Sequence, residues 1–223
     1  MEIARRAVPG SEVHGFDISP ALIDLARARS EPKGSPVTFE IADMATTAPK
    51  QIYDRLASRF GIMFFDDPGS AFGNLFRWLT PGGRFAFAVW GPQAQNPWMT
   101  TVRDAAAEII DLASPDPAAP GPFRYAEVDP LRGLLDHAGF GELEVIDWNG
   151  ELRIGGGLPA AEAAEFALAS FASFGELLAD AGGEALNDAR RSLTARFSPH
   201  QRDGVVTMDA CVYIVTGMRG MAR

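Results

Sequence analysis

The first part of the chain alternates between short apolar runs and stretches with helical spacing. The run Val13 to Asp17 ends in an acid, and Ser19-Pro20 follows it as a typical helix start. Val37 to Ile41 then alternates as a strand and is followed closely by a second acid, Asp43. Strands that alternate with helices form right-handed βαβ crossovers. The pattern therefore predicts a mostly parallel sheet with helices on both faces, in the α/β class.

The alternation continues through two more strands. A strand around Leu56 leads into helical spacing from Ala71 to Leu79. Thr80 to Gly83 has the composition of a tight turn, and the residues from Phe85 to Trp90 then alternate as a buried strand.

The second half of the chain combines helices with long strands. We predict, in order, a helix over 100–113, a proline-rich loop or lid over 115–122, a helix from Asp129 to Gly139, a strand over 143–154, helices over 159–180 and 184–197, and a β-rich segment over 205–216.

Length and composition favour one domain over residues 1–223, because 223 residues with 47% hydrophobic content close one sizeable core. No apolar run approaches the roughly 20 residues of a membrane-spanning helix, and the first residues lack a signal peptide's apolar stretch. We therefore expect a soluble, cytoplasmic protein with no membrane partner.

The charge and the single cysteine exclude several classes of function. A net charge of −9 argues against a nucleic-acid partner, since such surfaces concentrate Lys and Arg. Cys211 is the only cysteine, so the chain has neither an internal disulfide nor a cysteine cluster for a metal. A small-molecule or protein substrate fits this composition better, and no metal is expected.

The order of these features resembles the class I S-adenosylmethionine-dependent methyltransferases, in particular the small-molecule branch related to ubiquinone and menaquinone biosynthesis. Residues 13–19 resemble the family's second strand, 39–44 its third, 58–65 the end of its fourth, and 79–84 the turn into its fifth. The resemblance implies a Rossmann-like sheet with an antiparallel final strand and S-adenosylmethionine as cofactor. It places Asp17 on the ribose hydroxyls and Asp43 on the adenine amino group. The cofactor contacts that it assigns are Asp17, Ile18, Asp43, Met44, Arg59 and Phe60.

The same resemblance divides the chain into a cofactor-binding half, 1–92, and a substrate-side half, 93–223. It assigns substrate contacts to Phe64, Trp90, Asn96 and Trp98, the last two in a predicted loop. Packing in an ordinary core is the alternative for Phe64 and Trp90. Aromatic faces favour a cationic sulfonium, which supports the substrate-side interpretation. No catalytic residue is assigned, and the pair Asp66-Asp67 is interpreted as a solvated turn.

The sequence departs from the family at its start. The family begins with a strand and a glycine-rich turn that holds the cofactor's carboxypropyl end, whereas residues 1–10 resemble only the tail of the helix after that turn. Gly155 to Gly157 lies after the wrong strand to replace it. Because the family's first strand lies between the second and the fourth, we expect two unpaired strand edges. We interpret the gap as a shortened reading frame or as the mark of a degenerate protein.

Three functions are compatible with these residues. The first is methyl transfer to an O, N or C nucleophile of a small molecule, which needs little from side chains beyond positioning. The second is a non-catalytic homologue that keeps the fold as a binding or interaction module. The third, a nicotinamide-dependent dehydrogenase, does not explain Asp43 or Pro81-Gly82-Gly83. A homodimer is compatible with the chain, because a partner would cover exposed edges.

Overall fold

A computed structural model describes residues 2–29, 37–112 and 116–221 of the chain. Its strands are β1 (Val13–Asp17), β2 (Val37–Ile41), β3 (Tyr53–Arg59), β4 (Leu79–Trp90), β5 (Phe140–Arg153), β6 (Gln201–Arg202) and β7 (Val205–Arg219). Its α-helices are α1 (Glu2–Arg6), α2 (Pro20–Arg29), α3 (Pro68–Trp78), α4 (Pro97–Ala107), α5 (Asp129–His137), α6 (Ala160–Ser170), α7 (Ala172–Asp180) and α8 (Gly183–Phe197).

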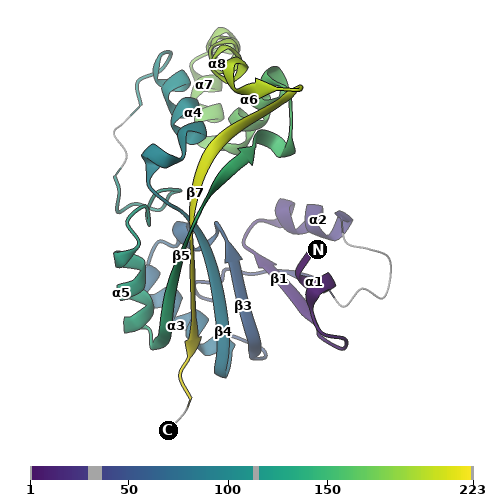
Figure 1. The fold of residues 1–223 in the computed structure, drawn as a ribbon, viewed down its shortest axis with the longest axis vertical. Helices are drawn as coiled ribbons and strands as arrows, with labels where there is room; N and C mark the ends of the chain where they lie inside the picture. The colour runs from purple at the N-terminus through teal and green to yellow at the C-terminus, as the bar shows by residue number, and fades with distance from the viewer. Residues whose placement is uncertain (1, 30–36, 113–115, 222–223) are drawn as a thin grey trace.

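The larger sheet has the strand order β3-β4-β7-β5, and the short β6 pairs with β7 (Figure 1). β3 and β4 are parallel, whereas β7 runs antiparallel to both β4 and β5. The predicted α/β class with an antiparallel final strand is confirmed. The larger sheet, however, has a single parallel pair, β3 and β4, where a mostly parallel sheet was expected.

The core of this sheet lies beneath α3 and α5. Phe85, Phe87 and Val89 alternate along β4 and are buried, as their period of two predicts. Phe87 packs against Phe72 of α3 with ring centroids 6.2 Å apart. Phe140 at the start of β5 contacts the ring of Phe85, with 4.8 Å between centroids. Each fully buried ring of this kind contributes roughly 1.5–3 kcal/mol relative to an exposed one.

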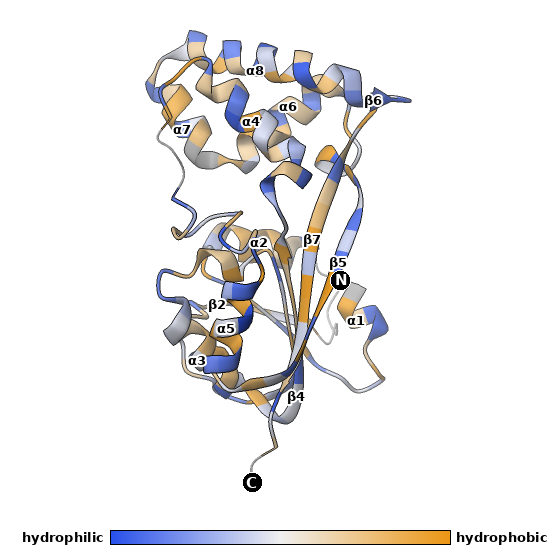
Figure 2. Ribbon diagram, turned by 60° about the vertical axis from the view of Figure 1, so that its left-hand side comes forward, coloured by the Kyte–Doolittle hydropathy of each residue, from blue (hydrophilic) through white to orange (hydrophobic). Residues whose placement is uncertain are grey.

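A helical layer formed by α4, α6, α7 and α8 packs on the far half of β5 and β7 (Figure 1). β7 is hydrophobic along much of its length (Figure 2). Its side chains alternate between its two faces, so the strand contributes to the helical layer and to the core beneath α3 and α5. Met208 lies in the cluster beside Ile154 and the helical layer, while Val215 pairs with Phe87 in the lower core. Residues of odd and even number on one strand face opposite sides. The helical layer therefore covers one face of the far half of β7, and α3 and α5 cover the opposite face of the other half, where Ile146 and Trp148 of β5 lie on the open face at 52% and 42% exposed.

β1 and β2 form a parallel sheet of their own to the side of β3 (Figure 1). In the described residues no backbone ladder joins this pair to β3, which is the arrangement expected without a strand between them. Before Ile62, the described residues contain one buried hydrophobic side chain, Ile23, and the other hydrophobic side chains are partly buried or exposed. Side-chain contacts therefore hold the two-stranded sheet to the rest of the molecule.

Several element boundaries differ from those predicted. The helix expected from residue 100 begins at Pro97 and ends at Ala107, so that the predicted substrate-side loop at 96–98 is the start of α4. The turn from Thr80 to Gly83 lies inside β4, where the register passes from Tyr53↔Leu79 to Arg55↔Arg84. Residues 113 and 115 of the predicted helix and loop lie outside the described residues.

Candidate active site

Asp17 and Asp43 lie at the same edge of the two-stranded sheet. Asp17 ends β1 and pairs in register with Ile41, the last residue of β2. The amide of Ala42 donates to the carbonyl of Asp17 at 3.0 Å, so the chain after β2 continues alongside the end of β1. The carboxyl ends of neighbouring parallel strands are the usual place for a ligand in an α/β sheet. The two predicted carboxylates are thus brought together at such an edge.

Local hydrogen bonds orient both carboxylates. Asp17 Oδ1 accepts from the amide of Ser19 at 2.8 Å. Asp43 Oδ1 accepts from the amide of Ala45 at 2.9 Å, and its Oδ2 accepts from Thr46 Oγ1 at 2.8 Å. An ionised carboxylate has about four acceptor positions. Each group therefore keeps acceptor capacity for the hydroxyl or amino groups of a ligand.

The two flanking residues assigned to the cofactor differ in exposure. Ile18, directly after Asp17, is 69% exposed, which places an apolar side chain on the surface of this edge. Met44, directly after Asp43, is partly buried and packs against the core.

The carboxyl ends of β3 and β4 carry a stacked aromatic pair. The rings of Phe60 and Trp90 lie 4.0 Å apart and nearly parallel, at 3°. Phe60 has a φ of 60°, in the left-handed region that bulky residues rarely adopt. Its amide donates to the carbonyl of Ala88, which holds this conformation. The guanidinium of Arg59 lies 5.9 Å from the Phe60 ring centroid. Backbone strain of this kind concentrates at binding sites.

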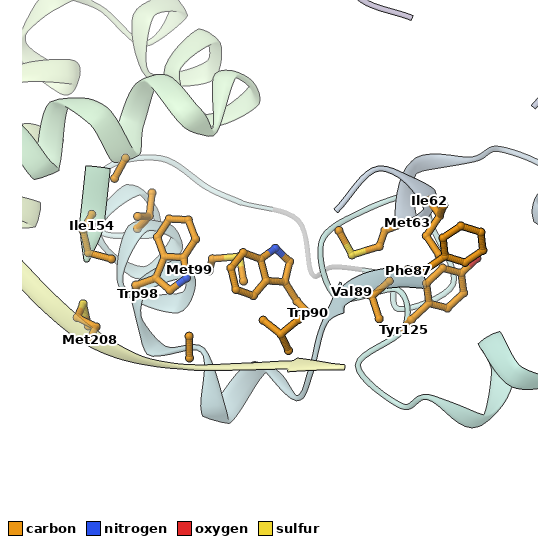
Figure 3. Close-up of a cluster of buried hydrophobic side chains, with 14 of the residues drawn as sticks. Ile62, Met63, Phe87, Val89, Trp90, Trp98, Met99, Tyr125, Ile154 and Met208 are labelled. Atoms are coloured by element: carbon orange, nitrogen blue, oxygen red, sulfur yellow. The ribbon is translucent and has the colours of Figure 1, made fainter. Parts of the chain in front are cut away.

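An aromatic series continues from this pair into the helical layer. Trp90 contacts Trp98 with 5.9 Å between centroids, and Trp98 contacts Phe171 at 5.5 Å. Figure 3 shows Trp90 between the cluster around Trp98 and the cluster around Phe87. The indole Nε1 of Trp98 is buried and has no hydrogen-bond partner in the part of the chain that the structure describes. Phe64 is 52% exposed and is not part of this series.

Asn96 is fully buried, and the main chain occupies its amide. Its Nδ2 donates to the carbonyls of Gly91, Pro92 and Cys211, and its Oδ1 accepts from the amide of Cys211. These bonds tie the turn after β4 to the middle of β7. The geometry gives Asn96 a structural role at this junction, in contrast to the substrate contact expected from the sequence.

Residues 1–87 match the family model described as a methyltransferase domain. Demethylmenaquinone methyltransferase of Thermus thermophilus is 36% identical over 89 residues, 40% of this chain and 40% of that protein. Trans-aconitate 2-methyltransferase of Methylobacterium radiotolerans is 29% identical over 165 residues, 63% of this chain and 58% of that protein. The chain thus spans less than two thirds of the length of these curated relatives.

The solved structures share the fold. A SAM-dependent methyltransferase of Methanosarcina mazei aligns with a TM-score of 0.51 at 16% identity, over 99% of this chain and 86% of that one. At this identity the likeness shows the fold alone, and it confirms the predicted Rossmann-like methyltransferase architecture.

The segment that matches the family model contains two buried residues, Asn74 and Trp78, that the sequence did not single out. Asn74 of α3 is 2% exposed and donates from Nδ2 to the carbonyls of Met44 and Thr47. Trp78 of the same helix donates from Nε1 to the carbonyl of Thr47 at 3.1 Å. A signal was available: Asn74 lies three residues after Ala71 and four before Trp78, on the apolar face of the helix. A polar residue on a buried face needs a partner.

The described ranges contain neither a metal-binding cluster nor a membrane-spanning helix. Among these residues, no group of three or more His, Cys, Asp or Glu side chains is arranged to hold a metal ion. Within the same residues, no helix has both the length and the apolar character needed to cross a bilayer.

Proposed function

We propose that the chain binds S-adenosylmethionine and takes part in methyl transfer to an O, N or C nucleophile of a small molecule. The observation that carries this proposal is the meeting of Asp17 and Asp43 at one sheet edge, inside the segment that matches the methyltransferase domain. When bound, S-adenosylmethionine supplies an electrophilic methyl group on a sulfonium, so the protein's task is mainly to place the two reactants.

The side chains at this edge suit the parts of the cofactor. The Asp17 carboxylate accepts hydrogen bonds from the ribose hydroxyls, and Asp43 accepts one from the adenine amino group. Ile18 and Met44 offer apolar contact beside the adenosine. Arg59 and Phe60, at the end of β3, would contact the methionine portion.

The aromatic series supports an acceptor site beyond the end of β4. The faces of Phe60 and Trp90 favour a cationic centre nearby. Trp98 carries a buried indole N–H that an oxygen of the acceptor would satisfy. Phe64 is exposed near the end of β3 and contributes apolar surface. We assign substrate contact to Phe64, Trp90 and Trp98, with Asn96 holding the turn between the two tryptophans.

The names of the relatives suggest small-molecule acceptors of differing chemistry. Demethylmenaquinone and trans-aconitate are the acceptors in the names of two of them. We propose a small organic molecule as the acceptor and assign no general base. The division into halves 1–92 and 93–223, the cytoplasmic location, the lack of a nucleic-acid partner and a homodimer stay predictions.

Calorimetry with S-adenosylhomocysteine tests the proposal. We expect binding to the chain, and Asp17→Ala should weaken it roughly tenfold or more, the loss of a charge-assisted hydrogen bond. Asp54→Ala is the matched control, because Asp54 is an exposed acid near the opposite, amino end of β3. It should leave the affinity unchanged.

Two outcomes would count against the proposal. A folded protein that does not bind S-adenosylhomocysteine would support the non-catalytic alternative. Equal affinity of the wild type and Asp17→Ala would remove the role of Asp17.

A further inference from the structure

The segment from Met44 to Thr47, directly after Asp43, is hydrogen-bonded to side chains of α3. Asn74 Nδ2 donates to the Met44 carbonyl at 2.9 Å and to the Thr47 carbonyl at 2.8 Å. Trp78 Nε1 donates to the same Thr47 carbonyl at 3.1 Å. Asn74 and Trp78 are only 2% and 3% exposed, so water competes little for these bonds.

Arg77 fixes the orientation of the Asn74 amide. Its Nη2 donates to Asn74 Oδ1 at 2.7 Å. Because the oxygen has this donor, both hydrogens of Nδ2 are directed to the loop carbonyls. The Asn74 amide therefore donates two hydrogen bonds to the loop and has a single favourable orientation.

These hydrogen bonds connect the loop after Asp43 to α3. They are important because the two sheets share no backbone ladder in the described residues. Asp43 bonds to the amide of Ala45 and the hydroxyl of Thr46, both inside the segment from Met44 to Thr47. The amide of Thr47 also donates back to the carbonyl of Asp43 at 2.8 Å. Asp43 and the segment from Met44 to Thr47 thus form one hydrogen-bonded unit. The bonds from α3 fix the position of this unit relative to β3 and β4.

We propose that Asn74 is a positioning residue that acts through Asp43 on the recognition of the purine amino group. The inference rests on the proposed function, in which Asp43 accepts a hydrogen bond from that amino group. Without Asn74, the Met44 carbonyl loses its donor and Thr47 keeps only Trp78. The carboxylate then samples positions from which it discriminates poorly between an amino and a carbonyl group on the purine.

The experiment compares wild type with Asn74→Ala in two measurements. The first is the binding ratio between S-adenosylhomocysteine and S-inosylhomocysteine, which carries an oxygen where adenine has its amino group. The wild type should prefer the adenosyl compound roughly tenfold, the value of one hydrogen bond set against an unpaired acceptor. In Asn74→Ala this ratio should fall toward one.

The second measurement is amide hydrogen exchange at Ala45, Thr46 and Thr47, with β4 as internal reference. Exchange at these three amides should rise roughly tenfold in Asn74→Ala, and β4 should be unchanged. Asp67→Ala is the matched control, because it removes the N-terminal cap of α3 without touching the loop. It should alter neither the loop exchange nor the ratio. Trp78→Phe, which keeps a ring but removes one donor, should show a smaller effect on the loop.

The outcomes separate the two proposals. An unchanged ratio in Asn74→Ala overturns the positioning role, whether or not the loop exchanges faster. Unchanged loop exchange overturns it equally. A wild type that binds neither compound refutes the proposed function instead, and the exchange measurement then decides whether Asn74 holds the loop.

Discussion

At the scale of single residues, Asp67 has a role beyond that of the solvated turn expected for Asp66-Asp67. It is the N-cap of α3, and its Oδ1 accepts from the amide of Ser70 at 3.1 Å. Hydrogen bonds from Ser70 hold the pKa of this carboxyl below its usual value of 3.8. The bond favours the ionised form, so its contribution to stability is present above pH 3.8 and is lost as the pH falls through the lowered pKa.

Asp67→Ala should therefore lower the thermal midpoint at neutral pH, with a difference from wild type that shrinks as the pH drops below 3.8. Asp67→Asn is the control, because the amide oxygen still caps the helix but does not titrate. Circular dichroism melts at several pH values measure both. A difference that is independent of pH would contradict the capping role.

The residues of the proposed site were predictable in part. Asp17 and Asp43 could be placed because each follows an alternating apolar run, and strand order alone brings such ends together. Asn96 could not be placed, because two of its hydrogen bonds reach Cys211, 115 positions away in the sequence. The residues near Asn96 in the sequence do not indicate a hydrogen-bond partner that far along the chain.

At the scale of elements, the helix starts show where local rules succeed. Ser19-Pro20 and Asn96-Pro97 carry the same signal, a capping residue followed by proline. The first was interpreted as a helix start, and α2 begins at Pro20. The second was assigned to a loop on resemblance, although α4 begins at Pro97. Both pairs thus mark the start of a helix, although the Asn96 side chain makes no capping hydrogen bond.

The junction between β4 and β7 gives the prediction at this scale. Asn96→Ala should reduce the free energy of unfolding by roughly 2–4 kcal/mol, because it leaves buried carbonyl and amide groups without partners. Denaturant titration measures the loss. Asn149→Ala is a suitable control, since this exposed residue pairs with Cys211 through its backbone. A loss equal to that of the control would show that the Asn96 amide contributes nothing to the junction.

At the scale of the whole molecule, the core is unevenly distributed. The larger sheet and the helical layer hold nearly all the buried apolar side chains of the described residues. The two-stranded sheet is joined to them by an aromatic cluster: Phe16 lies 5.0 Å from Trp78 and 6.2 Å from Tyr53, measured between ring centroids. The separation of the sheets agrees with the two unpaired strand edges expected from the sequence. The cluster was not, because it combines residues from β1, β3 and α3.

Phe16→Ala should loosen the two-stranded sheet while leaving the larger one intact. Loss of the ring removes contacts to both Tyr53 and Trp78, so amide exchange in β1 and β2 should rise roughly tenfold or more. Exchange in β4 and β7 should not change. Phe166→Ala, at a half-exposed ring on α6, serves as control. Uniform acceleration across both sheets would show that the molecule opens as one unit.

The length of β7 has a mechanical consequence. This strand is bonded to β4 and β5 along two of its sides and continues into the helical layer. A tension applied along its axis would load many hydrogen bonds in shear at once, whereas β1 and β2 share a single ladder of five pairs. A pulling force should therefore separate β1 and β2 first. The larger sheet around β7 should unfold last.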